Sequence, residues 1–275
     1  MVEFTVTQKR RLKELNAPTE LLERVFEKVS ERDAFFDKFV TNLVSDSKTR
    51  VQQSIKMKSR SSLKVIEKKV AEAVVLKGFT EVNTPILMPK SYIMRMGIDE
   101  SNKLWKQIIW LEDNLCLRPM LAPNLYYIMK RIRRFSQPVR IFEIGPCFRK
   151  EEEGLIHSNE FTMANIVELA PEGDPSIILQ EMISAVMNSV GLTNYEIKES
   201  PCMVYRRTHD ILVNGIEVAS AVIGPIPIDQ NWDITEPWAG VGFGLERLAM
   251  LSKGLNRIKP VVRSVTYLDS IFLNI

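Results

Sequence analysis

The chain has 275 residues, of which 45% are hydrophobic and 26% charged, and its formal net charge at pH 7 is +3. These values are ordinary for a folded soluble protein and predict one large domain with room for a small appendage. The three cysteines are far apart, which argues against a disulfide framework or a zinc site, and no apolar run is long enough for a signal peptide or a membrane span. A reducing cytoplasm fits this pattern.

Residues 1–60 are predicted to be helical and distinct from the rest of the chain. Thr7 is predicted to cap a short basic helix, and apolar residues then recur with helical spacing from Leu22 to Leu43, with a break near Ser30. Residues 45–60 carry mostly basic charges and are interpreted as a connector. A helical hairpin packed on the main domain is the favoured interpretation, and contact with a polyanion such as RNA is the alternative.

The next elements are predicted to begin with a helix over residues 63–77, which has one apolar face and stops at Gly78. A strand over 79–83 follows and ends at Pro85, which forbids further ladder hydrogen bonds and makes this unit a plausible dimer edge. We then expect a hairpin over 106–111 and 115–118, and a helix over 124–134 that opens after Pro123.

The second half of the chain is predicted to supply most of the sheet. Strands are expected over 139–150 and 161–169, a helix over 177–190, a hairpin over 208–213 and 216–223 turned by Asn214 and Gly215, and a strand over 240–244 leading into a helix at 245–251. Hairpins rather than crossover helices join most strands. The sequence therefore predicts an α+β fold, an antiparallel sheet flanked by helices, with a short N-terminal helical segment.

Alternate glycines at Gly240, Gly242 and Gly244 are the most informative local pattern. Period-two glycines leave one face of a strand without side chains, so that a flat ligand can lie against the backbone. Arg247 follows at the start of a helix, where a guanidinium can stack on a planar base or pair with a phosphate. A bulge or a tight packing site is the alternative.

Arg149 and Glu151 share one face if the strand that carries them continues. One interpretation of these two neighbouring residues is an ion pair on the protein surface with no role in binding. Facing a nucleotide, Arg149 would bind a phosphate bidentately and Glu151 would accept a hydrogen bond from a base amino group.

Asn165 is a lone amide on a strand face that it shares with Phe161, Met163 and Val167. An unpaired buried amide costs about 1–3 kcal/mol, so its partner must be either the protein or a ligand carbonyl, and the residues leave both open.

Glu217 and Ser220 are candidate ligands of Mg²⁺, which prefers oxygen donors and keeps several waters. Residues three apart point to opposite faces of a regular strand, so both can reach one ion only across a bulge or at a strand end. Without that, Ser220 would be a space filler and Glu217 an exposed charge.

The histidines His157 and His209 have no serine or cysteine spaced as in a known nucleophile motif, which argues against a hydrolase triad. Phosphate-binding Walker and dinucleotide glycine fingerprints are absent from the sequence.

Four segments resemble the pyrrolysyl-tRNA synthetases, a family of class II aminoacyl-tRNA synthetases. They are LRPMLAPNLY at 117–126, IFEIGPCFRKE at 141–151, AVIGPIP at 221–227 and GFGLERL at 242–248. The likeness runs from about residue 63 to the C-terminus, and Ser158, Asn159, Val167 and the stretch 267–270 depart from the family pattern.

The resemblance implies roles for matching positions. Arg149 and Arg247 would be catalytic groups on the triphosphate, Glu217 and Ser220 would hold Mg²⁺, and Asn165 would bind the substrate side-chain carbonyl. The implied ATP site is Arg149, Glu151, Phe161, Glu217, Ser220, Gly244 and Arg247. The implied amino-acid site is Leu121, Ala122, Leu125, Tyr126, Met129, Asn165, Val167, Tyr205, Val222, Trp238 and Gly240.

The activity implied by the resemblance is ATP-dependent activation of pyrrolysine, or of a related lysine derivative, and its transfer to the 3′ end of a cognate amber-suppressor tRNA. We expect a cytoplasmic homodimer of the form without a separate N-terminal tRNA-binding domain. Residues 61–275 would be the catalytic domain and residues 1–60 a possible tRNA contact. Alternatives are another class II synthetase, for an aromatic amino acid, and a non-catalytic RNA-binding paralogue.

Overall fold

The computed structural model describes residues 1–112, 114–150 and 154–274. They form two compact units, residues Met1–Ser62 with the C-terminal residues from Ser264, and residues Leu63–Arg263. The first unit thus ends at Ser62, and the residues from Ser264 cluster with it. No helix within the described ranges combines the length and apolar character that crossing a bilayer requires.

The smaller unit is built around a long helix. In chain order it contains β1 (Val2–Glu3), α1 (Val6–Glu14), α2 (Thr19–Leu22), β2 (Val25–Phe26), α3 (Val29–Lys56), β13 (Tyr267–Leu268) and β14 (Ile271–Phe272). Strand β1 pairs with β2, and β13 pairs with β14. Its core is aromatic, with Phe4 and Phe26 in edge-on contact at 5.0 Å between ring centroids.

Three predictions for this unit were wrong in detail. Thr5, not Thr7, caps α1, because Thr5 and Gln8 exchange the hydrogen bonds of a capping box. Val25 and Phe26 lie in a short strand rather than a helix, since pairing with β1 overrides their helical spacing. The expected connector is helical as far as Lys56, because no glycine or proline interrupts α3.

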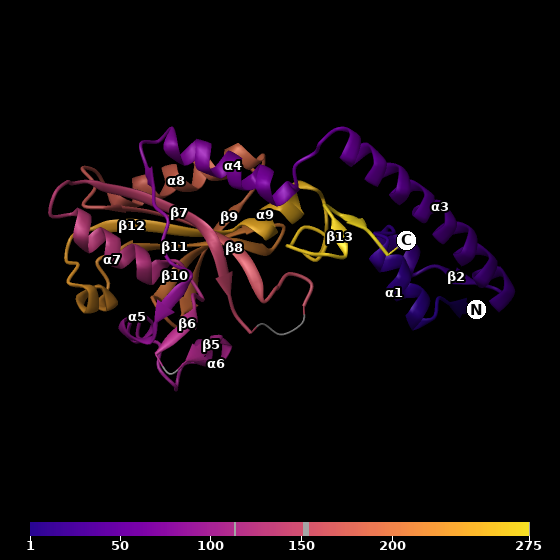
Figure 1. The fold of residues 1–275 in the computed structure, drawn as a ribbon, viewed down its shortest axis with the longest axis horizontal. Helices are drawn as coiled ribbons and strands as arrows, with labels where there is room; N and C mark the ends of the chain where they lie inside the picture. The colour runs from indigo at the N-terminus through magenta and orange to yellow at the C-terminus, as the bar shows by residue number, and fades with distance from the viewer. Residues whose placement is uncertain (113, 151–153, 275) are drawn as a thin grey trace. The chain divides into compact units, whose positions relative to one another are not determined.

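The larger unit contains a mixed sheet, seven-stranded within the described residues, in the order β3-β7-β8-β12-β11-β10-β9 (Figure 1). All neighbouring pairs are antiparallel except β3 with β7. This confirms the predicted antiparallel-rich α+β sheet. The strands are β3 (Thr80–Glu81), β7 (Val139–Phe148), β8 (Glu160–Leu169), β9 (Glu196–Cys202), β10 (Arg206–Val213), β11 (Ile216–Gly224) and β12 (Trp238–Gly244).

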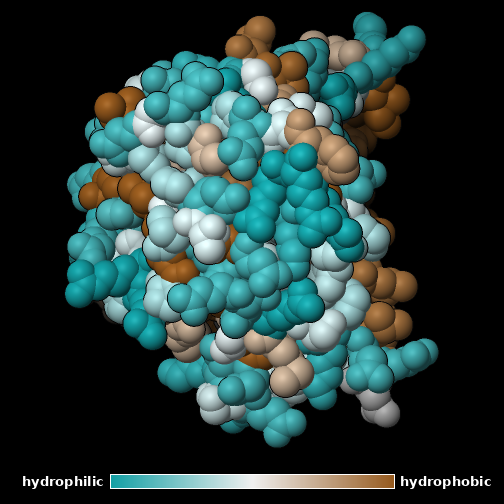
Figure 2. Space-filling view, turned by 90° about the vertical axis from the view of Figure 1, so that its left-hand side faces the viewer, coloured by the Kyte–Doolittle hydropathy of each residue, from teal (hydrophilic) through white to brown (hydrophobic). Residues whose placement is uncertain are grey.

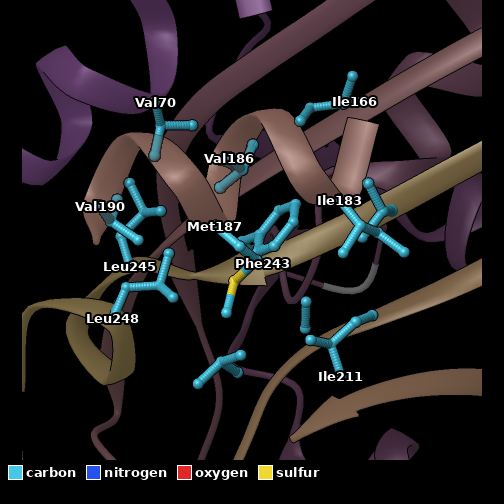
Figure 3. Packing of buried hydrophobic residues seen from close by; sticks show 14 of the residues in the cluster. Val70, Ile166, Ile183, Val186, Met187, Val190, Ile211, Phe243, Leu245 and Leu248 are labelled. Carbon is cyan, nitrogen blue, oxygen red and sulfur yellow. The ribbon is translucent and has the colours of Figure 1, made fainter. Parts of the chain in front are cut away.

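One face of this sheet is covered by α4 (Ser62–Val75), α8 (Pro175–Val190) and α9 (Leu245–Ser252). Figure 3 shows Val70 of α4 and Val186 of α8 converging with Phe243 of β12 in this core. Val70, Val186 and Phe243 have no exposed surface, and burial of such side chains stabilises the fold by roughly 1.5–3 kcal/mol each. This packing confirms the helices predicted over 63–77 and 177–190.

The opposite face carries a second core and the smaller elements. They are β4 (Leu87–Pro89), α5 (Lys90–Arg95), α6 (Lys103–Gln107), β5 (Trp110–Glu112), β6 (Leu115–Leu117), α7 (Ala122–Ile132) and the 3₁₀ helix η1 (Pro227–Trp232). Strands β4, β6 and β5 form their own small sheet. The hairpin of β5 and β6 confirms the prediction, although α6 replaces the expected start of its first strand.

Strand β9 was missed by the sequence analysis. It is an edge strand that pairs with β10 alone, and its side chains are mostly exposed, so no alternation of apolar and polar residues marks it. Pro201 lies within it, as is permitted at a sheet edge.

Period-two geometry assigns the residues of β12 and β8 to the two cores. Ala239, Val241 and Phe243 pack toward α8, whereas Trp238 packs in the second core. Asn165 and Val167 of β8 alternate with Ala164 and Ile166 in the same way. The face opposite α8 therefore carries the glycines, Asn165 and Trp238.

The surface in Figure 2 is largely hydrophilic, with hydrophobic side chains in small separate groups.

Candidate active site

A cavity of about 390 Å³ lies in the larger unit and collects residues from β8, β11, β12, α7 and the turn between β9 and β10. Leu121 is buried but is not among its lining residues, and Glu151 lies outside the described residues. The other residues expected for the site line it: Ala122, Leu125, Tyr126, Met129, Arg149, Phe161, Asn165, Val167, Tyr205, Glu217, Ser220, Val222, Trp238, Gly240, Gly244 and Arg247.

Arg149 follows directly after β7 and is held at one end of the cavity. Its Nε donates to the carbonyl of Pro119 at 2.8 Å, and its guanidinium carbon lies 5.2 Å from the centroid of the Phe161 ring. The backbone N–H of Arg149 also donates to the Asn159 carbonyl, which extends the ladder with β8 beyond its last assigned residue. These contacts orient a planar cation, which can accept an anionic group bidentately.

Arg247 lies in the first turn of α9 and reaches the same end of the cavity. Its Nη1 donates to the Glu217 carbonyl at 2.8 Å and lies 3.6 Å from the Glu217 carboxylate, and its Nε donates to the Ile156 carbonyl at 3.4 Å. The two guanidiniums thus come from segments about a hundred residues apart and line one cavity.

Glu246 secures the start of α9 against β8. Its side chain is buried, and both carboxyl oxygens accept from the N–H of Thr162 at 2.8 Å. Burial raises the pKa of this carboxyl, and the hydrogen bonds from Thr162 act in the opposite direction. Glu246 therefore fixes the base from which Arg247 projects.

The bulge that the sequence required is present in β11. Ile211 pairs with Ala219 but Leu212 pairs with Glu217, so Val218 is the extra residue. As a result Glu217 and Ser220 both line the cavity. Burial raises the pKa of the Glu217 carboxyl, although the charge of Arg247 works against the shift.

Asp210 is a further carboxylate beside this pair. It accepts from Ser220 Oγ at 2.8 Å and from Thr208 Oγ1 at 2.9 Å. Within the described ranges no three His, Cys, Asp or Glu side chains converge as a metal cage. The side chains of Glu217, Ser220 and Asp210 offer oxygen atoms only, which are the ligands that a cation such as Mg²⁺ takes beside phosphates and water.

Asn165 lines the cavity with an amide oxygen that has no hydrogen-bond partner among the described residues. This oxygen, Oδ1, is buried. It faces Gly242 across the β8–β12 pair, and a Cβ at Gly242 would lie 3.0 Å from Oδ1. Oδ1 is a hydrogen-bond acceptor, and a buried acceptor without a partner is costly, so this geometry favours a bound ligand that donates a hydrogen bond to it.

The far end of the cavity is apolar and aromatic. Tyr126 stacks on Trp232 at 5.4 Å between ring centroids and meets Trp238 edge-on at 5.8 Å. Val167 and Val222 belong to the same buried cluster. The cavity therefore joins a cationic end to an apolar end, with Asn165 between them.

A buried ion pair lies behind the cationic end. Arg118 Nη1 lies 2.6 Å from Glu143 Oε1, and both side chains are 1% exposed. Thr84 donates to the same carboxylate through its N–H and hydroxyl, and a Cβ at Gly145 would lie 2.1 Å from Arg118 Nη2. This network fixes the chain next to Pro119, the residue that orients Arg149.

Sequence reasoning missed several residues that line or support the cavity. His157 lines it, although a loop histidine is usually solvated. Glu246 lines it as well, although the sequence marks it only as part of the segment 242–248. Asp210 follows His209 with no pattern that distinguishes it. The Arg118–Glu143 pair and the contact of Asp229 with Tyr126 carry no local signal either, because the partners are distant in the chain.

A scan of family models matches residues 47–239 to the phenylalanyl tRNA synthetase beta chain CLM domain. A crystal structure of pyrrolysyl-tRNA synthetase from Desulfitobacterium hafniense aligns over all of both chains with 41% identity and a TM-score of 0.94. A second structure of the pyrrolysyl tRNA synthetase of that organism aligns with 40% identity and a TM-score of 0.91, over 99% of this chain and 96% of the other.

Curated relatives match only part of the chain. A histidine–tRNA ligase of Thermosipho africanus is 32% identical over 48% of this chain, and a lysine–tRNA ligase of Sulfolobus acidocaldarius is 29% identical over 45%. The aligned region spans only 34% and 23% of the length of those two proteins.

Proposed function

The chain belongs to the tRNA synthetase family matched by the phenylalanyl beta chain model and, within it, to the pyrrolysyl-tRNA synthetases, and we propose that it activates pyrrolysine with ATP and joins it to tRNA. The observation that carries the proposal is a cavity with two guanidiniums at one end and, before its apolar end, the buried Asn165 Oδ1, which has no partner among the described residues.

In the first step, a carboxylate oxygen of the amino acid attacks the α-phosphorus of ATP. The bond to the bridging oxygen breaks, and pyrophosphate leaves with the electron pair. Arg149 and Arg247 stabilise the negative charge that grows on the phosphate oxygens, so no protein nucleophile is needed. Mg²⁺, when bound, would neutralise part of the phosphate charge, and Glu217 and Ser220 are the residues that would hold it.

In the second step, a ribose hydroxyl at the 3′ end of tRNA attacks the carbonyl of the adenylate, and AMP leaves.

The glycines of β12 favour a flat substrate in the cavity, since Gly240, Gly242 and Gly244 all line it. The adenine ring has this shape, and the Arg247 guanidinium beside the strand can stack on it.

The amino-acid end suits a long, mostly apolar side chain that carries one carbonyl. The Asn165 Nδ2 group would donate to that carbonyl, and the unpaired Oδ1 would accept from an N–H of the ligand. The cluster around Tyr126, Val167 and Trp238 would enclose the apolar group beyond the carbonyl. Phenylalanine has no side-chain carbonyl for Asn165, which disfavours an aromatic substrate.

ATP–pyrophosphate exchange with a panel of amino acids tests the proposal. Exchange with pyrrolysine or bulky Nε-acylated lysines is the expected result. Exchange with phenylalanine alone would replace the substrate. Silence with every amino acid would favour a non-catalytic RNA-binding protein.

We also propose that the protein acts in the cytoplasm and that its smaller unit contacts tRNA. Lys48, Arg50 and Lys56 are exposed on the second half of α3, and Lys58 is exposed just beyond it. Exposed basic side chains around this half of the helix fit a phosphate backbone. Replacing Lys48 and Arg50 with alanine should weaken tRNA charging and leave pyrophosphate exchange, which needs no tRNA, unchanged.

The basic residues at the end of α7, Lys130, Arg131, Arg133 and Arg134, fit that role less well. Arg133 is paired with Glu236 at 2.7 Å, and Lys130 is paired with Asp233. These contacts favour a structural role in tying α7 to the segment after η1.

A homodimer through α4 and β3 is the proposed assembly. Leu76 is 87% exposed and Val75 is 52% exposed beside the edge strand β3, so an apolar surface adjoins unpaired backbone groups. Sedimentation of the wild type against Leu76→Asp checks it, and a monomeric wild type would contradict it.

A further inference from the structure

Asp229 is a buried carboxylate behind the apolar end of the cavity. It lies in η1, is 1% exposed and does not line the cavity itself. Its Oδ1 accepts from the Tyr126 hydroxyl at 2.7 Å, and its Oδ2 accepts from Trp238 Nε1 and from the Ile226 N–H, each at 2.7 Å. The carboxylate is thus satisfied by donors from three separate segments of the chain.

Two of these donors belong to side chains that wall the cavity. Tyr126 projects from α7, and Trp238 opens β12. The rings already touch edge-on, and Trp232 stacks on the other side of Tyr126. Burial raises the pKa of Tyr126, so that its hydroxyl stays protonated and donates to Asp229 throughout the neutral range.

Trp238 is positioned by a second feature. A Cβ at Gly224, its cross-strand partner, would lie 1.8 Å from Trp238 Nε1. The bare backbone of Gly224 is what allows the indole to lie flat across β11 with its N–H directed at Asp229. Ring contacts alone leave Tyr126 and Trp238 free to slide, whereas a shared acceptor fixes both polar tips at once.

We propose that Asp229 is the positioning residue that sets the shape of the apolar end, and so determines which amino-acid side chain the enzyme accepts. The inference rests on the proposed function of the cavity. In this account Asp229 touches no substrate. It fixes the angle between the Tyr126 and Trp238 rings, and that angle selects a long side chain with an apolar group beyond its carbonyl over shorter or thinner ones.

A double-mutant cycle of Asp229→Asn and Tyr126→Phe tests it. The amide introduced by Asp229→Asn keeps one oxygen for Trp238 and Ile226 but places its NH₂ group against the Tyr126 hydroxyl, so it disturbs the contact that Tyr126→Phe removes. We expect each single change to raise the KM for pyrrolysine about three- to tenfold and the double variant to match the larger single effect. The KM for ATP should stay within about twofold.

Selectivity gives a second measurement. The ratio of kcat/KM for pyrrolysine to that for a short Nε-acyl-lysine should fall in both single variants by about the same factor. Val222→Ala, which removes wall volume without touching Asp229, is the matched control, and its effect on KM should add to that of Asp229→Asn.

Additive effects of Asp229→Asn and Tyr126→Phe, or a parallel rise in the KM for ATP, would overturn the inference, because both indicate general destabilisation. An unchanged KM for pyrrolysine in both variants would overturn it as well. If Asp229→Asn does not fold, the selectivity of Tyr126→Phe decides. If the wild type activates another amino acid, the proposed substrate fails, and the same cycle is measured with that amino acid.

Discussion

The two ends of the cavity are built in different ways. The cationic end depends on a few charged side chains, and Arg149 and Arg247 are each held by hydrogen bonds to backbone carbonyls close to the rim. The apolar end depends on rings from α7, β12 and η1, which one buried carboxylate fixes from behind. The first end is tuned by charge at single positions, and the second by the packing of many positions.

This contrast predicts where changes will act. Substitutions at the cationic end should lower the rate of the chemical step, because charge develops there in the transition state. Substitutions toward the apolar end should alter the KM for the amino acid, because the contacts there are made equally in the ground state and the transition state.

The largest effect is expected for Arg149→Ala. Loss of a guanidinium that stabilises transition-state charge should lower kcat for adenylate formation by about a hundred- to a thousandfold. Single-turnover measurements of adenylate formation check it, with Arg149→Lys as the control that keeps the charge but loses the bidentate fork. A near-normal rate in Arg149→Ala would remove this residue from the site.

Asn165→Ala tests the boundary between the two ends. Loss of a hydrogen bond to the substrate carbonyl should raise the KM for pyrrolysine about ten- to a hundredfold. Binding of ATP should be nearly unchanged, and calorimetric titration of each substrate separates the two. Equal losses for ATP and pyrrolysine would place Asn165 outside the amino-acid pocket.

Two glycines on one strand sharpen the same boundary with smaller effects. In Gly242→Ala the new methyl would lie 3.0 Å from Asn165 Oδ1 and 3.2 Å from Met163 Cε. Displacement of Asn165 should raise the KM for pyrrolysine by about three- to tenfold. In the matched variant Gly244→Ala the nearest atom is 3.8 Å away, so the fold accepts the methyl.

Gly244→Ala should leave the KM for pyrrolysine unchanged and raise the KM for ATP, because Gly244 lies at the cationic end. Kinetics of pyrophosphate exchange on both variants give the comparison. The same response in the two variants would contradict the division of the cavity.

The smallest effect concerns stability and pH. Burial raises the pKa of Glu246 above its ordinary 4.5. The contribution of the protonated Glu246 carboxyl to the free energy of unfolding is therefore fully present below pH 4.5, and it is lost as pH rises through the raised pKa. Glu246→Gln keeps an acceptor for Thr162 and never ionises. The Tm of this variant minus the Tm of the wild type should therefore increase by about 2–4 °C from acidic to neutral pH. A pH-independent difference would mean that Glu246 does not titrate in this range.

The cationic end was largely predictable from short stretches of sequence. Arg149 follows a strand, Arg247 follows alternate glycines, and the bulge in β11 was required for Glu217 and Ser220 to share a face. Each of these inferences needs only the period of a strand and the chemistry of one side chain. Glu151, the remaining member of this group, lies outside the described residues.

The apolar end was accessible only through family resemblance. Tyr126, Trp232 and Trp238 read in sequence as ordinary core residues, and their meeting depends on how α7 and η1 pack on the sheet. Asp229 could not be singled out either, since its link to Tyr126 joins residues 103 apart in the chain and no local pattern marks its contacts with Ile226 and Trp238. The edge strand β9 was missed because its mostly exposed side chains show no alternation, and the cap Thr5 because Thr7 offers the same hydroxyl two residues later.

The central claim is that one cavity holds the α-phosphate against Arg149 and Arg247 and the side-chain carbonyl against Asn165. A crystal structure with a non-hydrolysable pyrrolysyl-adenylate analogue tests it most directly. We predict phosphate oxygens within hydrogen-bond distance of Arg149 and the side-chain carbonyl within the same distance of the Asn165 amide. An analogue bound with its phosphate remote from both guanidiniums, or with Asn165 still lacking a partner, would contradict the account.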